Sequence, residues 1–398
     1  MIDLKAARAD PEAMRDALAR KGAADAFDRL LEADARWREL VPRVDELRSQ
    51  TKAKGKPTPE QLEELQRLKG ELKEAEDALA TAEAERDAAL LEVPNPPDAS
   101  IPDGDSEDDA VELRRVGEPP QGEAKEAAEI GRFELERAAR LSGSRFGYLV
   151  GDTALLALAL YRFAIDHVTR AGFTPVLPPV LVREEAMVGT GFFPTERSNI
   201  YGLEEDGLYL TGTSEVALAG MHMGEILEND DLPIRYAGFS TCFRREAGAA
   251  GKDTRGMFRV HQFNKVEMFV FTRPDESRAE HDRMIELEED LLQTLGVPYR
   301  AVDVAAGDLG ASAVRKVDLE AWFPSQDRYR EVTSCSNTTD FQARRLGIRW
   351  RSADGLAPPH TLNGTVVTDR VVLAILETFQ GSVPEPLQEY GAPPRLRD

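Results

Sequence analysis

Cysteine and long apolar runs are both scarce in this sequence, and each scarcity excludes a class of protein. The 398 residues include two cysteines, Cys242 and Cys335, which are too few for a disulfide framework and indicate a reducing compartment. With five scattered histidines they form no cluster of zinc ligands, so we expect a protein without zinc. The longest apolar run, residues 154–161, is far shorter than the roughly 20 residues that a membrane helix needs. Because residues 1–5 also lack the apolar core of a signal peptide, we expect a soluble, cytoplasmic protein with no membrane partner.

A surplus of basic residues is missing as well. The chain has 72 acidic against 50 basic side chains, which gives a formal net charge of −22. Nucleic-acid binding depends on local lysines and arginines, so the total disfavours a generally basic surface but still permits a basic patch. Hydrophobic residues at 41% and charged residues at 31% are typical of a soluble globular protein. The length is enough for about two or three domains.

Residues 27–93 predict a pair of helices that fold back on each other. Glycine and proline at residues 55–59 interrupt the pattern, so we expect an antiparallel coiled-coil arm inside an N-terminal domain of residues 1–110. Pro42 is expected to kink the first helix. The apolar positions repeat every seven residues, at Leu30, Trp37 and Val44 with Ala33, Leu40 and Leu47, then at Leu65, Leu72 and Leu79 with Leu68, Ala75 and Ala82.

The tip of this arm carries four basic residues and no acid. These are Arg48, Lys52, Lys54 and Lys56. They form either an ordinary solvated turn between two helices or a contact for a polyanion, and the pattern alone leaves both interpretations open.

After a connector rich in proline and acidic residues (94–125), the sequence predicts an α+β catalytic domain over residues 111–398. Helical patterns at 154–170 and 276–295 alternate with strand-like runs, and strands far outnumber helices between residues 200 and 275. We therefore expect an antiparallel sheet with helices on one side. The common glycine-rich nucleotide motifs are missing from the sequence. The expected strands are residues 174–177, 234–243, 258–271, 299–304 and 328–332.

Residues 242–268 carry the most chemistry. Alternation along a strand would place Arg259, His261, Phe263, Lys265 and Glu267 on one face, with Val260, Val266 and Met268 toward the core. Such a face offers cations for phosphate or carboxylate, a ring for stacking and an anion for an ammonium group. The alternative is a salt-bridged exposed sheet.

The flanking segments extend this pattern. Arg244 and Glu246 would share one face of the preceding strand, and the glycine-containing loop 246–256 is typical of a mobile flap over a ligand. Residues 211–215 bring hydroxyls and a carboxylate to a turn. Residues 331–337 end a strand with an acid and several hydroxyls, which could hold Mg²⁺ through oxygen ligands. Each of these two patches alone is more often a capping or turn motif.

Taken together, these residues resemble the bacterial-type seryl-tRNA synthetases, a class II aminoacyl-tRNA synthetase family, over nearly the whole chain. The start Met1-Ile2-Asp3-Leu4 and the arm are similar to that family's tRNA-binding domain. Residues 172–179 resemble motif 1, the dimer-interface element, and residues 243–267 resemble motif 2. Residues 360–377 resemble motif 3, although Arg370 stands one residue closer to its start than is usual.

The resemblance implies a role for each candidate site residue. The catalytic residues would be Arg244, Arg259, Glu267 and Arg370. The serine-binding residues would be Thr213, Ser214, Glu215, Glu267, Asn363 and Thr365. The ATP-binding residues would be Arg244, Arg245, Glu246, Phe263, Glu331, Val332, Thr333, Ser334 and Arg370. The Mg²⁺ ligands would be Glu331 and Ser334, and the tRNA contacts would be Arg48, Lys52, Lys54 and Lys56.

By the same resemblance, the protein is expected to be a homodimeric ligase that uses ATP to activate L-serine and transfers it to tRNA-Ser, with selenocysteine tRNA as a second candidate acceptor. Glu267 would receive the serine ammonium group, and Phe263 and Arg370 would hold the adenine ring between them. One alternative is a paralogue that makes seryl-adenylate for a non-tRNA acceptor. Another is a non-catalytic relative that binds RNA, which the intact charged residues disfavour.

Overall fold

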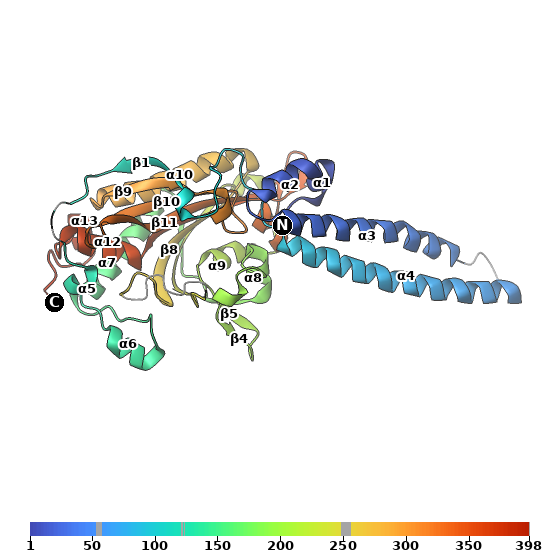
Figure 1. The fold of residues 1–398 in the computed structure, drawn as a ribbon, viewed down its shortest axis with the longest axis horizontal. Helices are drawn as coiled ribbons and strands as arrows, with labels where there is room; N and C mark the ends of the chain where they lie inside the picture. Colours follow the sequence, from blue (N-terminus) through green and yellow to red (C-terminus); the bar gives the residue numbers. More distant parts are fainter. Residues whose placement is uncertain (53–57, 121, 123, 248–255, 398) are drawn as a thin grey trace. The chain divides into compact units, whose positions relative to one another are not determined.

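The computed structural model describes residues 1–52, 58–120, 122, 124–247 and 256–397 (Figure 1). Lys54 and Lys56 of the predicted arm tip and residues 248–255 of the predicted flap therefore lie outside the described residues. The chain divides into two compact units, Met1–Pro96 and Pro97–Asp398. The functional domain limits expected from the sequence, 1–110 and 111–398, stay a prediction.

The first unit consists of helices, two of them long. Figure 1 shows α3 and α4 side by side. Ion pairs between them join Arg29 to Glu92, Arg36 to Glu85 and Arg48 to Glu76, so the partner number falls as the α3 number rises. This order confirms the predicted antiparallel helical arm. The helices of this unit are α1 (Leu4–Ala9), α2 (Pro11–Ala19), α3 (Ala24–Gln50) and α4 (Pro59–Glu92).

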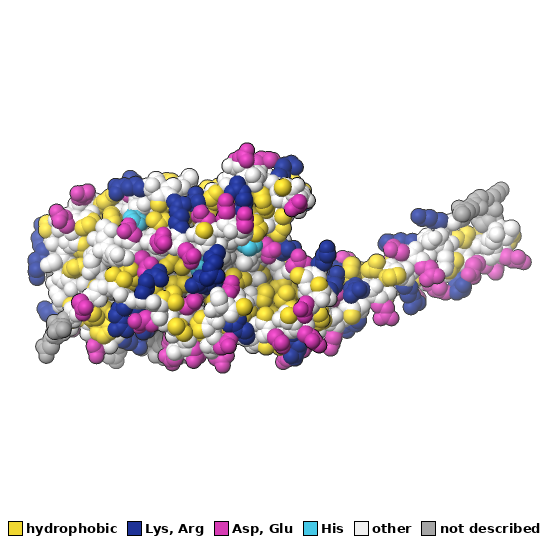
Figure 2. All heavy atoms as spheres, turned by 90° about the horizontal axis from the view of Figure 1, so that it is seen from above, with side chains coloured by type: hydrophobic (Ala, Val, Ile, Leu, Met, Phe, Trp, Pro, Cys, Tyr) yellow, Lys and Arg dark blue, Asp and Glu magenta, His cyan; other side chains and the backbone are white. Residues whose placement is uncertain are grey.

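The arm is held by a narrow apolar seam. Val44, Leu47 and Ala75 are buried between the helices, in agreement with the heptad positions. A capping box between Thr58 and Gln61 begins α4. Pro42 lies inside α3 without ending it, although its ring removes a backbone donor. Away from the seam, acidic and basic side chains are interspersed along the two helices (Figure 2).

The second unit is built on one large, mostly antiparallel sheet. Among the described residues it is eight-stranded, in the order β1-β9-β10-β11-β14-β8-β7-β2, and only the β2–β7 pair is parallel. This arrangement confirms the predicted fold class. The strands of the sheet are β1 (Val111–Val116), β2 (Thr174–Val176), β7 (Ile234–Phe243), β8 (Gln262–Thr272), β9 (Tyr299–Asp303), β10 (Arg315–Phe323), β11 (Arg328–Thr339) and β14 (His360–Thr368).

Helices and two small sheets complete this unit. The helices are α5 (Ala127–Ile130), α6 (Leu135–Ser142), α7 (Asp152–Arg170), α8 (Glu184–Thr190), α9 (Glu215–Gly220), α10 (Ser277–Thr294), α11 (Phe341–Leu346), α12 (Asp369–Phe379) and α13 (Glu385–Gln388). The remaining strands are β3 (Leu181–Arg183), β4 (Gly202–Leu203), β5 (Leu208–Leu210), β6 (Ile226–Leu227), β12 (Arg349–Ser352) and β13 (Gly355–Ala357). None of the described helices combines the length and apolar character needed to cross a membrane.

Strand β8 separates two apolar clusters by the alternation of its side chains. Val266 and Met268 join the cluster with α7, α10 and α12, as the pattern predicted. Phe269 and Phe271 join the cluster with α9 and α11 on the other face. Both faces of β8 are therefore covered by other elements, and its charged residues Lys265 and Glu267 are buried.

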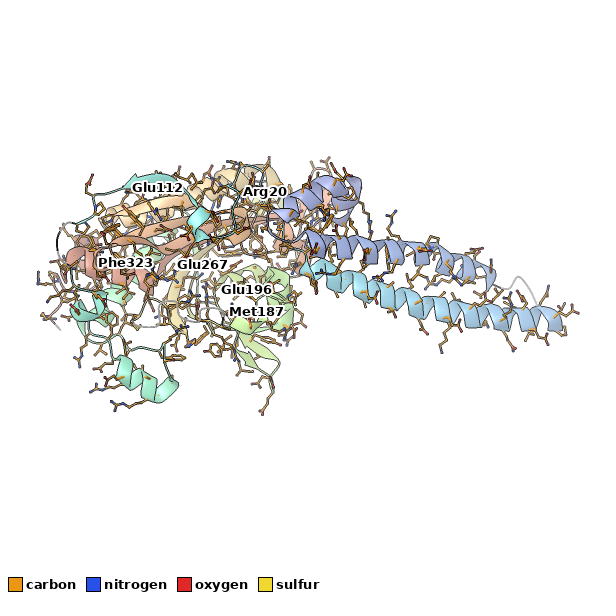
Figure 3. All side chains as sticks on the ribbon, in the orientation of Figure 1. Arg20, Glu112, Met187, Glu196, Glu267 and Phe323 are labelled. Carbon is orange, nitrogen blue, oxygen red and sulfur yellow. The ribbon has the colours of Figure 1, made fainter. Side chains whose placement is uncertain are left out.

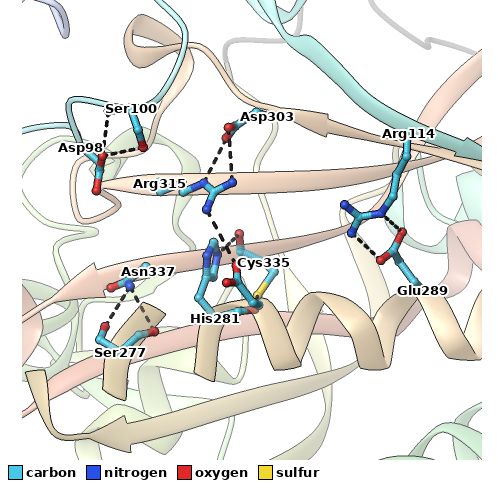
Figure 4. A network of polar contacts seen from close by, with 11 residues as sticks. Asp98, Ser100, Arg114, Ser277, His281, Glu289, Asp303, Arg315, Cys335 and Asn337 are labelled. Atoms are coloured by element: carbon cyan, nitrogen blue, oxygen red, sulfur yellow. Dashed lines mark hydrogen bonds and ion pairs between the residues drawn. The ribbon is translucent and has the colours of Figure 1, made fainter. Parts of the chain in front are cut away.

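Polar contacts fix α10 to the sheet (Figure 4). The His281 Nε2 lies 3.1 Å from the Cys335 carbonyl oxygen, and the Asn337 amide donates to the Ser277 hydroxyl over 2.9 Å. Burial lowers the pKa of His281 to about 4, so the ring is neutral at neutral pH. Helix α10 is thereby locked against β11, behind the strands that carry the site.

The strand predicted at 258–271 was placed too early at its start, and Arg244 and Glu246 were wrongly expected to lie on the preceding strand. Strand β7 ends at Phe243 and β8 begins at Gln262, so Arg244, Glu246, Arg259 and His261 lie outside the strands. Glu246 has a left-handed backbone with φ of 52°, which turns the chain out of the sheet. A single backbone hydrogen bond, from Arg244 N to His261 O over 2.9 Å, still joins the two segments.

Candidate active site

A cavity lies over β8, β11 and the start of α12, and we call it the β8 cavity. Its wall includes most of the predicted nucleotide residues, since Arg244, Glu246, Arg259, Phe263, Glu331, Val332, Thr333, Ser334 and Arg370 all line it. Lys265 and Thr365 complete the floor from β8 and β14. The structure thus brings together residues that are far apart in the sequence.

A second cavity, which we call the α8 cavity, adjoins the first. The residues that line it include Thr190, Glu196, Glu215, Ser312, Ser336 and Asn363. Five side chains line both cavities, namely Arg244, Glu246, Arg259, Glu331 and Ser334. The two cavities therefore meet at a pair of arginines and a pair of carboxylates.

Glu267 does not line the two cavities itself, but it contacts two side chains that line the β8 cavity. It is 1% exposed and lies on β8 (Figure 3). Its Oε2 lies 2.5 Å from Lys265 Nζ and accepts a hydrogen bond from the Thr365 hydroxyl over 3.1 Å. Lys265 and Glu267 are two residues apart on one strand, so the sequence pattern placed them on the same face correctly.

Glu215 is a second buried carboxylate near Glu267. It accepts hydrogen bonds from Gln342 Nε2 over 2.7 Å and from Asn363 Nδ2 over 3.1 Å. Burial and the nearby charge of Glu267 raise the pKa of Glu215 to about 7. Among the described residues, Lys265 is the one cation that forms an ion pair with either carboxylate, so the two carboxylates carry one more charge than Lys265 balances when both are ionised.

Arg370 and Glu331 face each other across the β8 cavity. Arg370 Nη1 donates to the Glu331 carbonyl over 3.1 Å, and the two side chains form an ion pair at 3.5 Å. Partial burial raises the pKa of Glu331, but Arg370, Lys316 and Arg244 outweigh this effect and hold it below its ordinary value. Glu331 is therefore an ionised oxygen donor at neutral pH.

Aromatic rings line the same cavity. The Arg244 guanidinium carbon lies 5.3 Å from the centre of the Phe263 ring, and that of Arg370 lies 4.7 Å from the centre of the Phe258 ring. Glu246, which follows Arg244, accepts a hydrogen bond from Arg259 Nε over 2.5 Å. The rings and guanidinium planes offer flat surfaces for a planar ligand.

Three further predicted site residues, Thr213, Ser214 and Arg245, do not line either cavity. The guanidinium of Arg245 donates to the Ile200 carbonyl and stacks on Tyr201, and Arg245 does not line the two cavities. The Ser214 hydroxyl donates to the Gly238 carbonyl over 3.4 Å and points at β7. Thr213 is buried, and its hydroxyl accepts from the backbone N–H of Glu215 over 3.2 Å, so it positions Glu215.

The sequence reasoning did not assign several residues of the site. The sequence pattern pointed to Lys265, since it shares the predicted strand face of Phe263 and Glu267. No sequence pattern pointed to Gln342, because it reaches Glu215 from 127 positions away in the sequence. Asp369 lines the β8 cavity beside Arg370, and of these two motif 3 residues the sequence assigned a role only to the arginine.

Comparisons with known proteins agree with this geometry. Residues 1–97 match the model of the seryl-tRNA synthetase N-terminal domain, and residues 200–379 match that of the class II tRNA synthetase core domain (G, H, P, S and T). A serine--tRNA ligase of Acidothermus cellulolyticus is 49% identical over 411 residues, which cover 98% of each chain. The chain belongs to the seryl-tRNA synthetase family.

Other members of the seryl-tRNA synthetase family show the same full-length similarity. The serine--tRNA ligase of Nocardia farcinica is 49% identical over 405 residues, covering 97% of this chain and 96% of its own. The crystal structure of the seryl-tRNA synthetase from Pyrococcus horikoshii, complexed with ATP, superimposes with a TM-score of 0.92 at 38% identity, covering 98% of each chain. The resemblance seen in the sequence motifs is therefore confirmed.

Proposed function

We propose that this protein is a serine--tRNA ligase, which activates L-serine with ATP and transfers the seryl group to tRNA-Ser. The observation that carries the proposal is the position of Arg244 and Arg259, which line both cavities at their junction. Two anions must meet there in such a reaction, the serine carboxylate and the α-phosphate of ATP. Paired arginines lower the repulsion between them and hold them in line.

The buried carboxylates supply the amino-acid specificity in this proposal. Glu267 and Glu215 have one cation, Lys265, between them, so the serine ammonium group would add the missing positive charge. Thr365 lies beside Glu267 and would bind the substrate hydroxyl. Alanine would leave this polar group without a partner.

The β8 cavity would hold ATP. Phe263 and Arg370 lie on its wall and would take the adenine ring between them, with Glu246 near the adenine and Arg259 toward the phosphates. Arg259 and Glu246 bind each other in this structure, so the nucleotide would have to compete for the arginine. The solved Pyrococcus relative is complexed with ATP.

Glu331 and Ser334 fit a magnesium ion. Both line the junction of the cavities, and the cations around Glu331 keep it ionised. No cluster of three or more acidic, histidine or cysteine ligands occurs among the described residues. Mg²⁺ usually binds through one or two protein oxygens plus substrate phosphates, so this small donor set is adequate. The ion would supply positive charge at the phosphates.

The reaction follows from these placements in two steps. A carboxylate oxygen of serine attacks the α-phosphorus, the bond to the β-phosphate oxygen breaks, and pyrophosphate leaves. A ribose hydroxyl at the tRNA 3′ end then attacks the seryl carbonyl, and AMP leaves. Arg244 and Arg259 would stabilise the charge that develops on the phosphate oxygens, and no protein nucleophile is needed.

The acceptor in this proposal is tRNA and not a carrier molecule. Residues 1–97 match the N-terminal domain of seryl-tRNA synthetases, which an enzyme for another acceptor would not need. Lys52 is exposed at the end of the arm, whereas Arg48 already forms an ion pair with Glu76. We place the tRNA contact at Lys52 together with Lys54 and Lys56 of the sequence.

We further propose that the enzyme is a cytoplasmic homodimer. Strand β2 is an edge strand of the large sheet, and it belongs to the predicted dimer element. Leu177, directly after it, is 82% exposed, and Leu158 on α7 is 61% exposed. Exposed leucines beside an unpaired strand edge are typical of a protein interface. Sedimentation equilibrium of the purified protein tests this part, and a monomer would contradict it.

The activation step is tested by serine-dependent exchange of pyrophosphate into ATP. We expect exchange with L-serine, and at least about a hundredfold less with alanine or threonine at equal concentration. Equal exchange with all three amino acids, or none with serine, would contradict the proposal.

A further inference from the structure

Asp369 ties together three elements around the β8 cavity. It is 7% exposed and is the first residue of α12. Its Oδ1 accepts a hydrogen bond from the hydroxyl of Tyr161 on α7. Its Oδ2 accepts from the backbone N–H of Asn264 on β8 over 3.2 Å. Both carboxylate oxygens are therefore used, and each points to a different element.

The contact with Asn264 extends the sheet by one position. Strand β14 pairs with β8 up to Thr368, whose partner is Lys265. Asn264 is the next residue along β8, and its N–H is bound by a side chain because β14 has already turned into α12. A second bond holds the same residue on its other side, from the Thr241 hydroxyl to Asn264 Oδ1 over 2.9 Å. Asn264 is thus fixed from both neighbouring elements.

The residues next to these two anchor points both line the β8 cavity. Phe263 precedes Asn264, and Arg370 follows Asp369, and both side chains line the β8 cavity. The Arg370 guanidinium is itself directed by the Phe258 carbonyl at 3.3 Å and the Glu331 carbonyl at 3.1 Å. The backbone distance between Phe263 and Arg370 is consequently set through one carboxylate.

We propose that Asp369, held by Tyr161, is a positioning residue that sets the width of the adenine slot between Phe263 and Arg370. The inference rests on the proposed function, in which this cavity binds ATP. Asp369 touches no reacting atom in this arrangement. It acts by joining the two chain segments that carry the walls of the slot.

Burial and charge are consistent with a structural brace of this kind. Burial raises the pKa of Asp369 to about 6, while the hydrogen bonds from Tyr161 and Asn264 oppose that rise. The carboxylate also lies at the N-terminus of α12, where a negative charge is favoured. Near neutral pH the ionised acceptor form predominates, which is the form that can accept both hydrogen bonds.

The test measures KM for ATP and KM for serine in pyrophosphate exchange, with Asp369→Ala and Asp369→Asn. The alanine variant removes both bonds, and we expect KM for ATP to rise about tenfold while KM for serine stays within about twofold. Asparagine can still accept from Asn264 with its oxygen and donate to the tyrosine oxygen, so we expect values within about twofold of the parent. If Asp369 were needed only for folding, its loss would reduce the fraction of active enzyme and lower kcat, and KM for ATP would not rise more than KM for serine. Unchanged KM for ATP, or an equal rise in both KM values, would overturn the inference.

Tyr161→Phe keeps the test decisive if the alanine variant does not fold. We expect about a threefold higher KM for ATP, because one of the two bonds of Asp369 is lost. Tyr390→Phe is the matched control: it also removes a tyrosine–aspartate bond on α7, to Asp166 over 3.0 Å, and Tyr390 does not line the two cavities. Equal effects of the two tyrosine variants would overturn the inference.

Calorimetry with ATP alone separates this inference from the proposed function. A parent protein that binds ATP but shows no serine-dependent exchange would contradict the proposed function. In that case, about tenfold weaker ATP binding by Asp369→Ala would still support the slot, and unchanged binding would overturn it.

Discussion

The residue with most effect on the proposed chemistry is Glu267, because its charge is balanced inside the protein. It is 1% exposed and forms an ion pair with Lys265 at 2.5 Å. A buried ion pair is costly to break from one side, since the remaining charge keeps its desolvation penalty. The same carboxylate would bind the substrate ammonium group, so substrate binding and local stability depend on one side chain.

Glu267→Gln should therefore lower serine-dependent exchange by about a hundredfold or more, because breaking a buried pair costs on the order of 3–5 kcal/mol. The measurement is kcat/KM for serine in pyrophosphate exchange. Glu112→Gln is the control, since Glu112 forms an exposed ion pair with Arg115 on β1 and lies far along the sheet order. Equal losses in the two variants would contradict the role of Glu267.

Glu288 predicts a pH effect on stability. It is 1% exposed on α10, neither carboxyl oxygen has a hydrogen-bond partner in the described structure, and burial raises its pKa well above the ordinary value. Between its unfolded and folded pKa values, the folded state holds a proton that the unfolded state has lost. The protein should therefore lose stability as the pH rises above about 4.5, by up to about 1.4 kcal/mol per pH unit.

Glu288→Gln removes this proton and tests the effect. The melting temperature of the variant, relative to the parent, should be higher at pH 8 than at pH 5. A difference that does not change with pH would show that the Glu288 carboxyl is already ionised in the folded protein.

At the scale of elements, the strands were predicted best where side-chain alternation and backbone agree. Strand β7 has the bounds that the sequence predicted, residues 234–243. The start of β8 was placed too early because apolar and charged side chains already alternate through residues 258–261, before the backbone enters the sheet at Gln262. Alternation reports side chains and says nothing of the hydrogen bonds that define a strand.

The residues of the candidate site also differ in how well the sequence predicted them. Lys265, Glu267 and Phe263 could be grouped from spacing on one strand, and Glu331 with Arg370 required the family motifs. Gln342 and Tyr161 could not be found, because they reach the site from α11 and α7 through contacts between distant parts of the chain. Arg245 and Ser214 were assigned from their place in motifs, but their side chains point toward other backbone carbonyls.

Strand β14 gives a prediction at this scale. A Cβ atom at Gly364 would lie 2.8 Å from Glu288 Oε1, 3.0 Å from Met284 Cε and 3.2 Å from Cys335 Sγ. Gly364→Ala should therefore destabilise the second unit by about 1–3 kcal/mol and raise KM for serine, because Asn363 and Thr365 move with the strand. Gly220→Ala has no atom within 4 Å of the new Cβ and should change stability by less than about 0.5 kcal/mol. Equal melting temperatures for the two variants would contradict the close packing.

At the scale of the whole molecule, the two units would have separate functions, with serine activation in the second unit and tRNA binding in the first. The second unit holds both cavities, and the first unit matches the family's N-terminal domain. The chain as a whole has a net charge of −22, so an RNA contact requires a local basic site. The expected tip residues Lys52, Lys54 and Lys56 supply one.

Replacing these three lysines by glutamate should weaken serine transfer to tRNA by about tenfold or more at low salt, and the difference from the parent should shrink at higher salt, because fewer phosphate contacts remain to be screened. Pyrophosphate exchange should stay within about twofold of the parent, because no cavity residue changes. Lys69→Glu with Lys73→Glu places similar charge changes on α4 away from the tip and should have a smaller effect. Equal losses of transfer and exchange in the tip variant would contradict a role in tRNA binding.

The most direct test of the account is transfer of labelled L-serine to total tRNA by the purified protein, with pyrophosphate exchange measured on the same preparation. We expect both serine transfer and pyrophosphate exchange, with label on serine-accepting tRNA alone. Exchange without transfer would contradict tRNA as the acceptor, and a folded protein with neither activity would contradict the proposed function as a whole.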